Sequence, residues 1–157
     1  MRTIAEIKQY LTFKLGGAVY ALDVARVREV LDCTTVTKIP RMPEFMRGVI
    51  NLRGNVVPVV DLRLGFGLTN TDTTGNACII VVEVQLEADA MVLGALADSV
   101  EEVIELEPEQ VEPAPRIGRR IKTDFIRGMV KRESDFILIL DIDKVFFGGR
   151  LGARRSR

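Results

Sequence analysis

Residues 48–66 read GVINLRGNVVPVVDLRLGF, and this stretch decides the fold. Short runs of Val, Ile and Leu bounded by Gly and Asn are typical of buried β-strands. Between the runs, Arg53 is followed by Gly54 and Asn55, and these two tolerate the positive φ of a tight hairpin turn. Pro58 lacks a backbone N–H, so we expect its strand at a sheet edge or at a bulge. Arg53 is then a cation at the tip of a rigid hairpin, a position suited to recognition.

The composition indicates a globular chain of ordinary charge balance. The 157 residues fit one domain, or two very small ones sharing a core, and 47% of them are hydrophobic. Lys and Arg together number 22, as do Asp and Glu, so the net charge of zero disfavours nonspecific nucleic-acid binding. No apolar run approaches the roughly 18–20 residues of a membrane span. The N-terminus also lacks the apolar core of a signal peptide, so we expect a cytoplasmic protein without membrane insertion.

Histidine is absent from the sequence, which removes the commonest general base and the commonest metal ligand. The two cysteines, Cys33 and Cys78, lack C-x-x-C spacing, and for Cys33 we expect an inert buried thiol. The glycine pairs of the chain lack the full spacing of a phosphate-binding loop. We therefore predict neither a metal site nor a cofactor, and interpret the chain as a binding module.

The second half of the chain repeats the first. Residues 19–31 align with residues 92–104 at an offset of 73, which pairs Val27 with Val100. Three further segments align at offsets of 75 and 80, in the same order along the chain. Small, growing offsets are typical of a duplicated supersecondary unit with insertions in its loops.

Each repeat contains about four or five short strand patterns and one helical turn, which predicts a mainly β fold of two small barrels. Neither half, of roughly 70 residues, buries a large core alone. We therefore expect the barrels to pack on a shared hydrophobic core, with a groove at their junction. Val27 and Val100 hold equivalent positions, so both are candidates to face that groove. The tail at residues 148–157 is rich in Gly and Arg and is predicted to be disordered.

Several candidate residues have more than one interpretation. Asp61 and Asp141 recur after an apolar strand of each repeat, and paired carboxylates can act as acid and base. The repeat places them in separate barrels, which favours hydrogen bonding to turns, and an enzyme with a carboxylate site is the rival interpretation. Arg53 can also be interpreted as a solvated turn residue without a binding role. Glu29 can also be interpreted as part of a solvated face.

These motifs resemble the CheW family of bacterial chemotaxis coupling proteins. The resemblance is carried by VYALDVARVREVL, VTKIPRMPEFMRGVINLRGNVVPVVDLR, DSVEEVIEL, VEPAP and FIRGMV…ILILDIDKVF. It covers residues 8–147 and implies two intertwined five-stranded β-barrels without catalytic activity. On this basis the first barrel comprises mostly residues 18–76 and the second mostly residues 79–135, with the terminal strands open to exchange between them.

The resemblance also implies partners and contact residues. Members of the family bridge chemoreceptors to the histidine kinase CheA, through its regulatory domain, in membrane-associated arrays on the cytoplasmic side. The positions that match the family's receptor contacts are Val27, Glu29, Arg53 and Val100. The positions near the family's kinase and ring contact are Glu112, Arg116 and Ile117. A coupling module for a different chemosensory-type pathway, such as surface motility, is the alternative interpretation.

Overall fold

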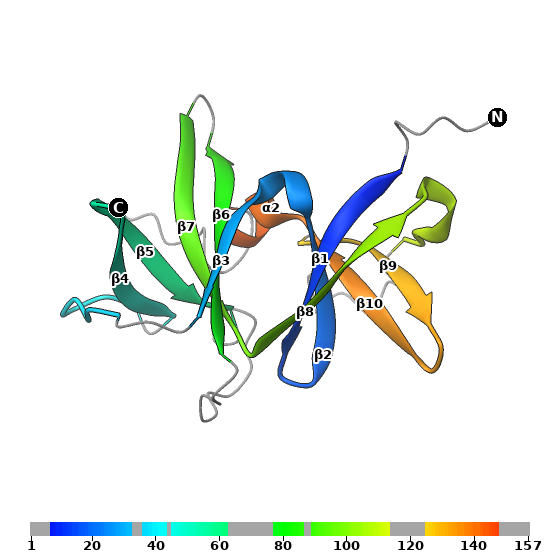
Figure 1. Ribbon diagram of the computed structural model, residues 1–157, viewed down its shortest axis with the longest axis horizontal. Coiled ribbons are helices and arrows are strands. Elements are labelled where there is room, and N and C mark those ends of the chain that lie inside the picture. The colour runs from blue at the N-terminus through cyan, green and yellow to red at the C-terminus, as the bar shows by residue number, and fades with distance from the viewer. Residues whose placement is uncertain are drawn as a thin grey trace.

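The computed structural model describes residues 7–32, 36–43, 45–62, 77–86, 89–113 and 125–147. These residues form two five-stranded sheets (Figure 1). Sheet A contains, in spatial order, β8 (Ser99–Leu106), β1 (Lys8–Leu15), β2 (Ala18–Asp23), β10 (Asp135–Leu140) and β9 (Ile126–Arg132). Sheet B contains, in spatial order, β3 (Val27–Asp32), β6 (Cys78–Leu86), β7 (Asp89–Ala97), β5 (Asn55–Asp61) and β4 (Met46–Leu52). The predicted mainly β class with two five-stranded units is confirmed.

Within the described residues, short helical elements accompany the strands. They include the 3-10 turns η2 (Val24–Arg26) and η3 (Pro108–Gln110) and the α-helix α2 (Ile142–Phe147). Residues 24–31 contain a 3-10 turn and a strand in succession, η2 and then β3. Within the described part of the chain, no helix combines the length and apolarity needed to cross a membrane.

The internal repeat is visible in the topology. Each sheet has three antiparallel pairs and one parallel pair, which is β2 with β10 in sheet A and β7 with β5 in sheet B. The two strand orders correspond one to one, since β3 to β7 of sheet B take the places of β8, β9, β10, β1 and β2 in sheet A. The predicted duplication is therefore confirmed.

Each sheet combines strands from both repeats. The first-repeat strands β1 and β2 join sheet A, and the second-repeat strands β6 and β7 join sheet B. The sheets thus divide the chain differently from the segments 18–76 and 79–135 expected for the two barrels. The tail at residues 148–157, for which we predicted disorder, lies outside the described residues.

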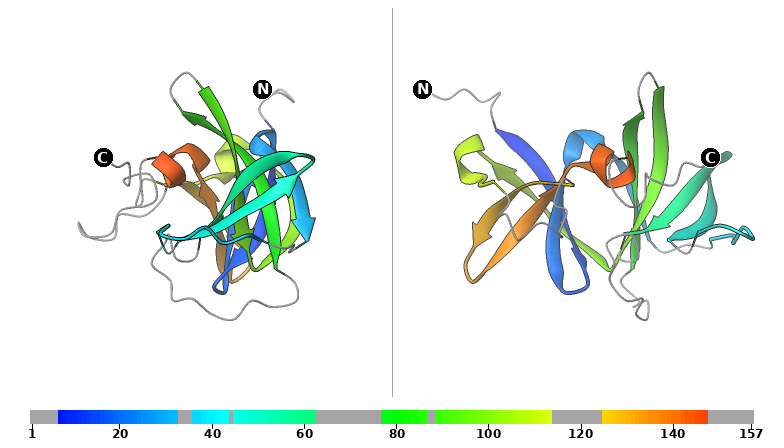
Figure 2. Two further views of the ribbon diagram at one scale, coloured as in Figure 1. Left: turned by 90° about the vertical axis from the view of Figure 1, so that its left-hand side faces the viewer. Right: turned by 180° about the vertical axis from the view of Figure 1, so that it is seen from behind.

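The largest core joins the two sheets. It combines Phe13 and Leu22 of sheet A with Ile80 and Val82 of sheet B, and all four are almost fully buried. Two smaller clusters each belong to one sheet, around Ile139 in sheet A and in sheet B around a group of aliphatic residues, Ile50, Val57, Val59, Ile79, Val81 and Leu96. Figure 2 shows the sheets side by side, with α2 between them. The predicted packing on a shared hydrophobic core is confirmed, and burial of each large side chain contributes about 1.5–3 kcal/mol.

Pro58 lies in an interior strand, although it predicted an edge strand or a bulge. It pairs with Val49 of β4, while the parallel ladder of β5 with β7 begins one residue later, at Val59. Pro58 therefore stands where β5 is paired on one side only, and its missing N–H removes no bond from the ladder with β7.

Two glycines permit a close approach of neighbouring backbone. At Gly48, with φ of 142°, an added Cβ would lie 2.1 Å from the carbonyl oxygen of Thr37. At Gly128, 80 residues later, an added Cβ would lie 2.9 Å from the carbonyl oxygen of Glu112. Short segments around Thr37 and Glu112 pair with β4 and β9 at these points. Glycine is thus required at equivalent positions of both repeats.

Candidate functional site

The β4–β5 hairpin ends in a two-residue turn formed by Arg53 and Gly54, with φ of 51° and 86°. Leu52 and Asn55 form the last pair of the hairpin, and the Gly54 N–H donates to Oδ1 of Asn51 at 2.8 Å. The sequence had suggested positive φ at Gly54 and Asn55, so the turn is shifted by one residue. Two consecutive positive φ angles give the twist of a type I′ turn, which matches that of the flanking strands. Arg53 therefore occupies the turn itself.

Glu29 and Arg53 are brought together by the fold. The two guanidinium nitrogens Nη1 and Nη2 of Arg53 donate to Oε1 and Oε2 of Glu29 at 2.8 and 3.0 Å. Hydrogen bonds from Arg53 lower the pKa of Glu29 below its ordinary value, and the same bonds raise the pKa of Arg53. A bidentate pair of this geometry fixes the direction of both side chains. The Arg53 side chain nevertheless stays 70% exposed, so it remains accessible to a partner.

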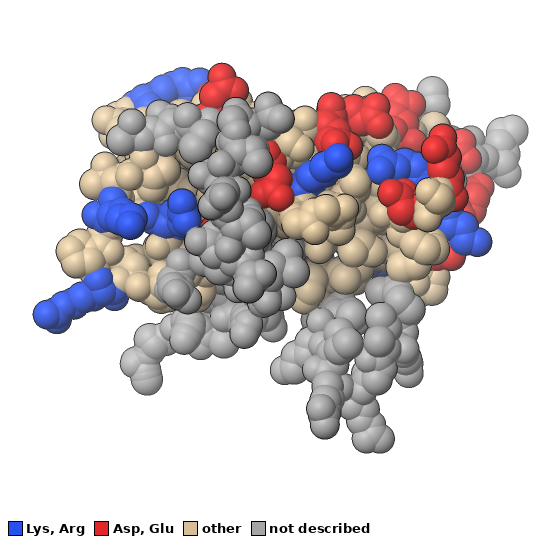
Figure 3. Space-filling view, turned by 90° about the horizontal axis from the view of Figure 1, so that it is seen from below, with Lys and Arg blue, Asp and Glu red and all other residues tan. Residues whose placement is uncertain are grey.

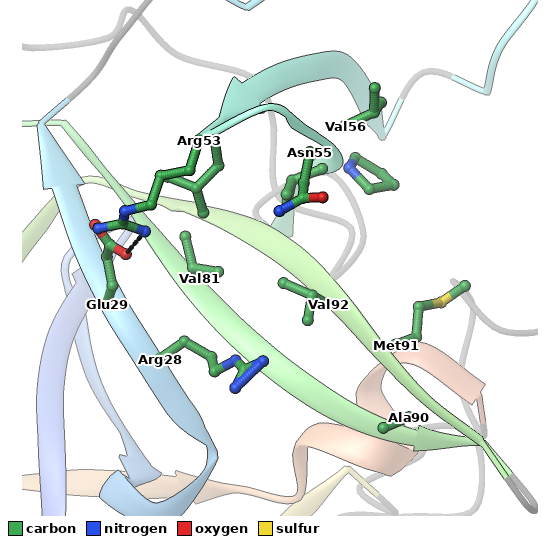
Figure 4. Close-up of a pocket in the computed structure, with 12 residues that line it drawn as sticks. Arg28, Glu29, Arg53, Asn55, Val56, Val81, Ala90, Met91 and Val92 are labelled. Atoms are coloured by element: carbon green, nitrogen blue, oxygen red, sulfur yellow. Dashed lines mark hydrogen bonds and ion pairs between the residues drawn. The ribbon is translucent and has the colours of Figure 1, made fainter.

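The pair joins the two ends of sheet B. Glu29 lies on β3 and Arg53 follows β4, and these are the two outermost strands of the sheet. Between them lies a pocket of about 700 Å³ (Figure 4). Its apolar lining comes from Leu52, Val56, Val57, Pro58, Val81, Ala90, Met91 and Val92, and its polar lining from Arg28, Glu29, Arg53 and Asn55. Apolar walls with a few polar groups at the rim suit the recognition of a side chain or a short segment.

Val27 and Val100 lie on equivalent edge strands of the two sheets. Val27 begins β3 and pairs with Val82, and Val100 lies on β8 and pairs with Phe13. Both valines are half-buried and pack against the core shared by the two sheets. Val27 shares its strand with Glu29, whereas Val100 lies on the other sheet.

Two further valines on the same two strands are exposed and were not among the predicted site residues. Val30 on β3 is 41% exposed and Val103 on β8 is 52% exposed, at positions related by the offset of 73. The spacing of Val27 and Val30, repeated in Val100 and Val103, was the signal that could have identified them. We call these four residues the valine surface. Exposed aliphatic groups on edge strands are a feature of protein contact sites.

The candidate kinase contact is described only in part. Glu112 pairs with Met129 of β9 and forms an ion pair with Lys131, with 3.8 Å between Oε2 and Nζ. Its side chain remains 45% exposed. Arg116 and Ile117 lie outside the described residues.

Asp61 and Asp141 each have a structural role in their own sheet. The buried Asp61 of β5 lies 3.7 Å from a guanidinium nitrogen of Arg47. Asp141, which follows β10, lies 3.9 Å from a nitrogen of Arg127 and accepts a bond from the backbone N–H of Lys144. Each carboxylate thus stabilises an arginine on the adjacent strand. No group of three or more potential metal-ligating side chains occurs in the part of the chain that the structure describes.

Charge is distributed unevenly between the two ends of the molecule. Figure 3 shows Lys and Arg side chains at the left, where β4 and β5 lie, and many Asp and Glu side chains towards the right. The segment from residue 101 to residue 112, which includes most of β8 and all of η3, contains six glutamates and no basic residue. Separated charge of this kind orients an approaching partner before contact is made.

Comparisons with known proteins agree with this architecture. The CheW-like domain family matches residues 9–147. Chemotaxis protein CheW of Klebsiella aerogenes is 33% identical over 138 residues, covering 88% of this chain and 81% of that protein. Chemotaxis protein CheW of Bacillus subtilis is 32% identical over 145 residues, covering 90% of each chain.

A solved structure has the same fold. The crystal structure of the scaffolding protein TtCheW from Thermoanaerobacter tengcongensis matches with a TM-score of 0.77 at 35% identity. The match covers 88% of this chain and 92% of that one. The family match covers residues 9–147, which include both five-stranded sheets, so this chain belongs to the CheW-like family.

Proposed function

We propose that this protein is a non-catalytic scaffold that couples chemoreceptors to the histidine kinase CheA and so controls the activity of the kinase. Membership of the CheW-like family supports this function, as do the relatives named as chemotaxis proteins and the related scaffolding protein. On this proposal the protein acts in the cytoplasm, in membrane-associated receptor arrays.

The observation that carries the proposal is the bidentate pair of Glu29 and Arg53. Glu29 of this pair lies on β3, the strand that also contains Val27. On this proposal the partner is the cytoplasmic tip of a receptor, an amphipathic helical hairpin. The apolar face of that hairpin would contact aliphatic side chains such as Val27 and Val100. Glu29 and Arg53 then fix the register of the helix by charge complementarity. The fixed geometry of the pair reduces the side-chain entropy lost on binding.

The valine surface sets the extent of this receptor contact. Val30 and Val103 add exposed aliphatic area on both sheets, so that the receptor helix would contact sheet A and sheet B together. A helix that contacts both sheets is sensitive to the position of one sheet relative to the other. On this proposal a receptor signal would change that relative position and so reach the rest of the array.

The kinase regulatory domain would bind elsewhere, near Glu112, Arg116 and Ile117. Glu112 is exposed in part and forms an isolated bridge with β9 of sheet A, whereas the Arg53 turn belongs to sheet B. Separate surfaces allow both partners to bind one molecule at once. Repetition of weak contacts in an array raises the overall affinity through effective concentration.

The direct test is an NMR titration of the isotope-labelled protein. The first ligand is a soluble chemoreceptor fragment containing the cytoplasmic tip, and the second is the CheA regulatory domain. We expect the receptor fragment to shift amides around Val27, Arg53 and Val100, and the kinase domain to shift a different set around Glu112. Arg53→Glu should abolish the first set of shifts and kinase activation in a reconstituted receptor mixture.

Arg132→Glu is the matched control, because Arg132 also lies at a hairpin and pairs with Asp135 at 3.4 Å. The control variant should bind the receptor fragment as the wild type does. A folded wild-type protein that responds to neither ligand contradicts the proposal. A response to the corresponding domains of another chemosensory pathway would assign the same coupling role to that pathway.

A further inference from the structure

Helix α2 connects the two sheets. It follows β10 of sheet A directly and packs against β6 of sheet B, as the rear view in Figure 2 shows. Ile142 and Val145 are buried in the shared core. The helix therefore has a fixed position relative to both sheets.

One carboxylate oxygen of Asp143, on this helix, accepts two hydrogen bonds. Its Oδ1 accepts a hydrogen bond from the backbone N–H of Gln85 on β6 at 2.8 Å. The same oxygen accepts a bond from Nη2 of Arg26, which also forms an ion pair with it. The side chains of Arg26 and Asp143 are 21% and 36% exposed, so the pair is shielded in part from water and from salt.

Arg26 is the last residue of η2, the turn that leads from sheet A into sheet B. The start of the turn is fixed by Asp23, whose Oδ1 accepts a bond from the N–H of Ala25 at 2.9 Å. None of the three residues of η2 is fully buried, and Val24 at its start packs against the shared core. The bond from Arg26 to Asp143 fixes its end, immediately before Val27.

The second repeat lacks this arrangement. The offset of 73 that relates Val27 to Val100 places Ser99 at the position of Arg26. Serine carries no charge and cannot form an ion pair. Val100 is instead preceded by Ser99, the first residue of β8, and by Asp98, which separates β7 from β8. The two halves of the valine surface are therefore held by different means.

We infer that Asp143 is a positioning residue for the receptor contact: through Arg26 it fixes η2, and thereby Val27, relative to α2 and the shared core. This inference rests on the proposed function and names a residue that positions part of the receptor-binding site. The contact between Arg26 and Asp143 acts on the half of the valine surface around Val27, and Ser99, which precedes Val100, carries no charge for such an ion pair.

The test compares full-length variants with labelled valine methyl groups. Arg26→Ala removes the ion pair and keeps the bond between Asp143 and Gln85, whereas Asp143→Ala removes both. Both variants should shift the Val27 methyl signals and leave those of Val100 unchanged. Both should also bind a soluble chemoreceptor tip fragment about five- to tenfold more weakly, in line with the loss of one charged hydrogen bond.

Two comparisons separate positioning from a general loss of stability. Arg26→Lys keeps the positive charge and should recover most of the affinity. Asp135→Ala removes another ion-paired carboxylate, in the β9–β10 hairpin, and should leave affinity and both sets of methyl signals unchanged. In the double variant Arg26→Ala/Asp143→Ala, affinity should fall no further than in Asp143→Ala, because both residues act through one contact.

The outcomes are distinct for the inference and for the proposed function. Unchanged Val27 methyl signals, or wild-type affinity in both alanine variants, overturn the inference while the proposed function stands. If the wild-type protein does not bind the receptor fragment, the proposed function is wrong, and so is the role of Val27 in receptor binding. In that case the Val27 signals of Arg26→Ala still decide whether Asp143 positions this strand.

Discussion

Substitution of Gly48 by alanine tests the close approach between β4 and the segment around Thr37. An added Cβ would lie 2.1 Å from the carbonyl oxygen and 2.8 Å from the carbonyl carbon of Thr37, which forces the two backbones apart. This separation strains two hydrogen bonds between Thr37 and Val49, of 2.8 and 2.9 Å. Overlap and weakened bonds together cost about 2–4 kcal/mol. The positive φ adds about 1–2 kcal/mol for alanine.

Gly17→Ala provides the matched control. Gly17 has a φ of 91°, and an added Cβ there meets no atom within 4 Å, so only the cost of the positive φ applies. Urea unfolding followed by circular dichroism should give a free energy of unfolding about 2–4 kcal/mol lower for Gly48→Ala than for Gly17→Ala. Gly128→Ala should fall between the two, since its closest backbone contact is 2.9 Å. A difference below about 1 kcal/mol between the first two variants would refute the close approach.

Three further predictions concern the charged pairs and the shared core. The pKa of Glu29 is lowered by Arg53, so the pair is intact above the ordinary pKa of glutamate and is lost as the pH falls through the lowered value. Carboxyl-detected NMR should therefore show a higher midpoint for Glu29 in Arg53→Gln than in the wild type, and equal midpoints would contradict the pairing. Asp61→Ala should lower the free energy of unfolding by about 3 kcal/mol and Asp141→Ala by about 1 kcal/mol, because Asp61 is fully buried and Asp141 is 21% exposed. Equal losses in denaturant titrations would argue against that difference. Val145→Ala should cost about 2 kcal/mol and keep one unfolding transition monitored by probes in either sheet, whereas two separate transitions would show that the core does not couple the sheets.

The class of fold could be predicted because local patterns carry it. Alternating apolar runs gave the strands, and the repeat of 73 to 80 residues gave two similar units on a common core. The exchange of strands between sheets is a different matter. β2 pairs with β1 on one side, and whether β10 pairs with its other side depends on contacts between distant segments that no local pattern reports.

The sequence named candidate residues for the site, which stay a prediction, but it did not indicate their geometry. The hairpin pattern around Arg53 was recognisable, yet the sequence did not indicate that Arg53 itself adopts a positive φ or pairs with Glu29. The contact between Arg26 and Asp143 joins residues separated by 117 positions, beyond the reach of periodicity. The spacing of Val24, Val27 and Val30 fits a helical turn as well as a strand, so the sequence did not indicate that Val30 lies exposed on an edge strand.

The parallel pairs described above also determine the order in which the protein can fold during synthesis. Sheet B has all its strands once β7 has left the ribosome, at Ala97, whereas β2 of sheet A must wait for β10, which ends at Leu140. Pairing of such distant segments is slow, because the entropy of loop closure is lost before the contacts form. Strand β2 thus emerges early and finds its parallel partner last. A nascent chain would expose the edge of β2 for most of its translation, and a chaperone that shields this edge would raise the yield of folded protein.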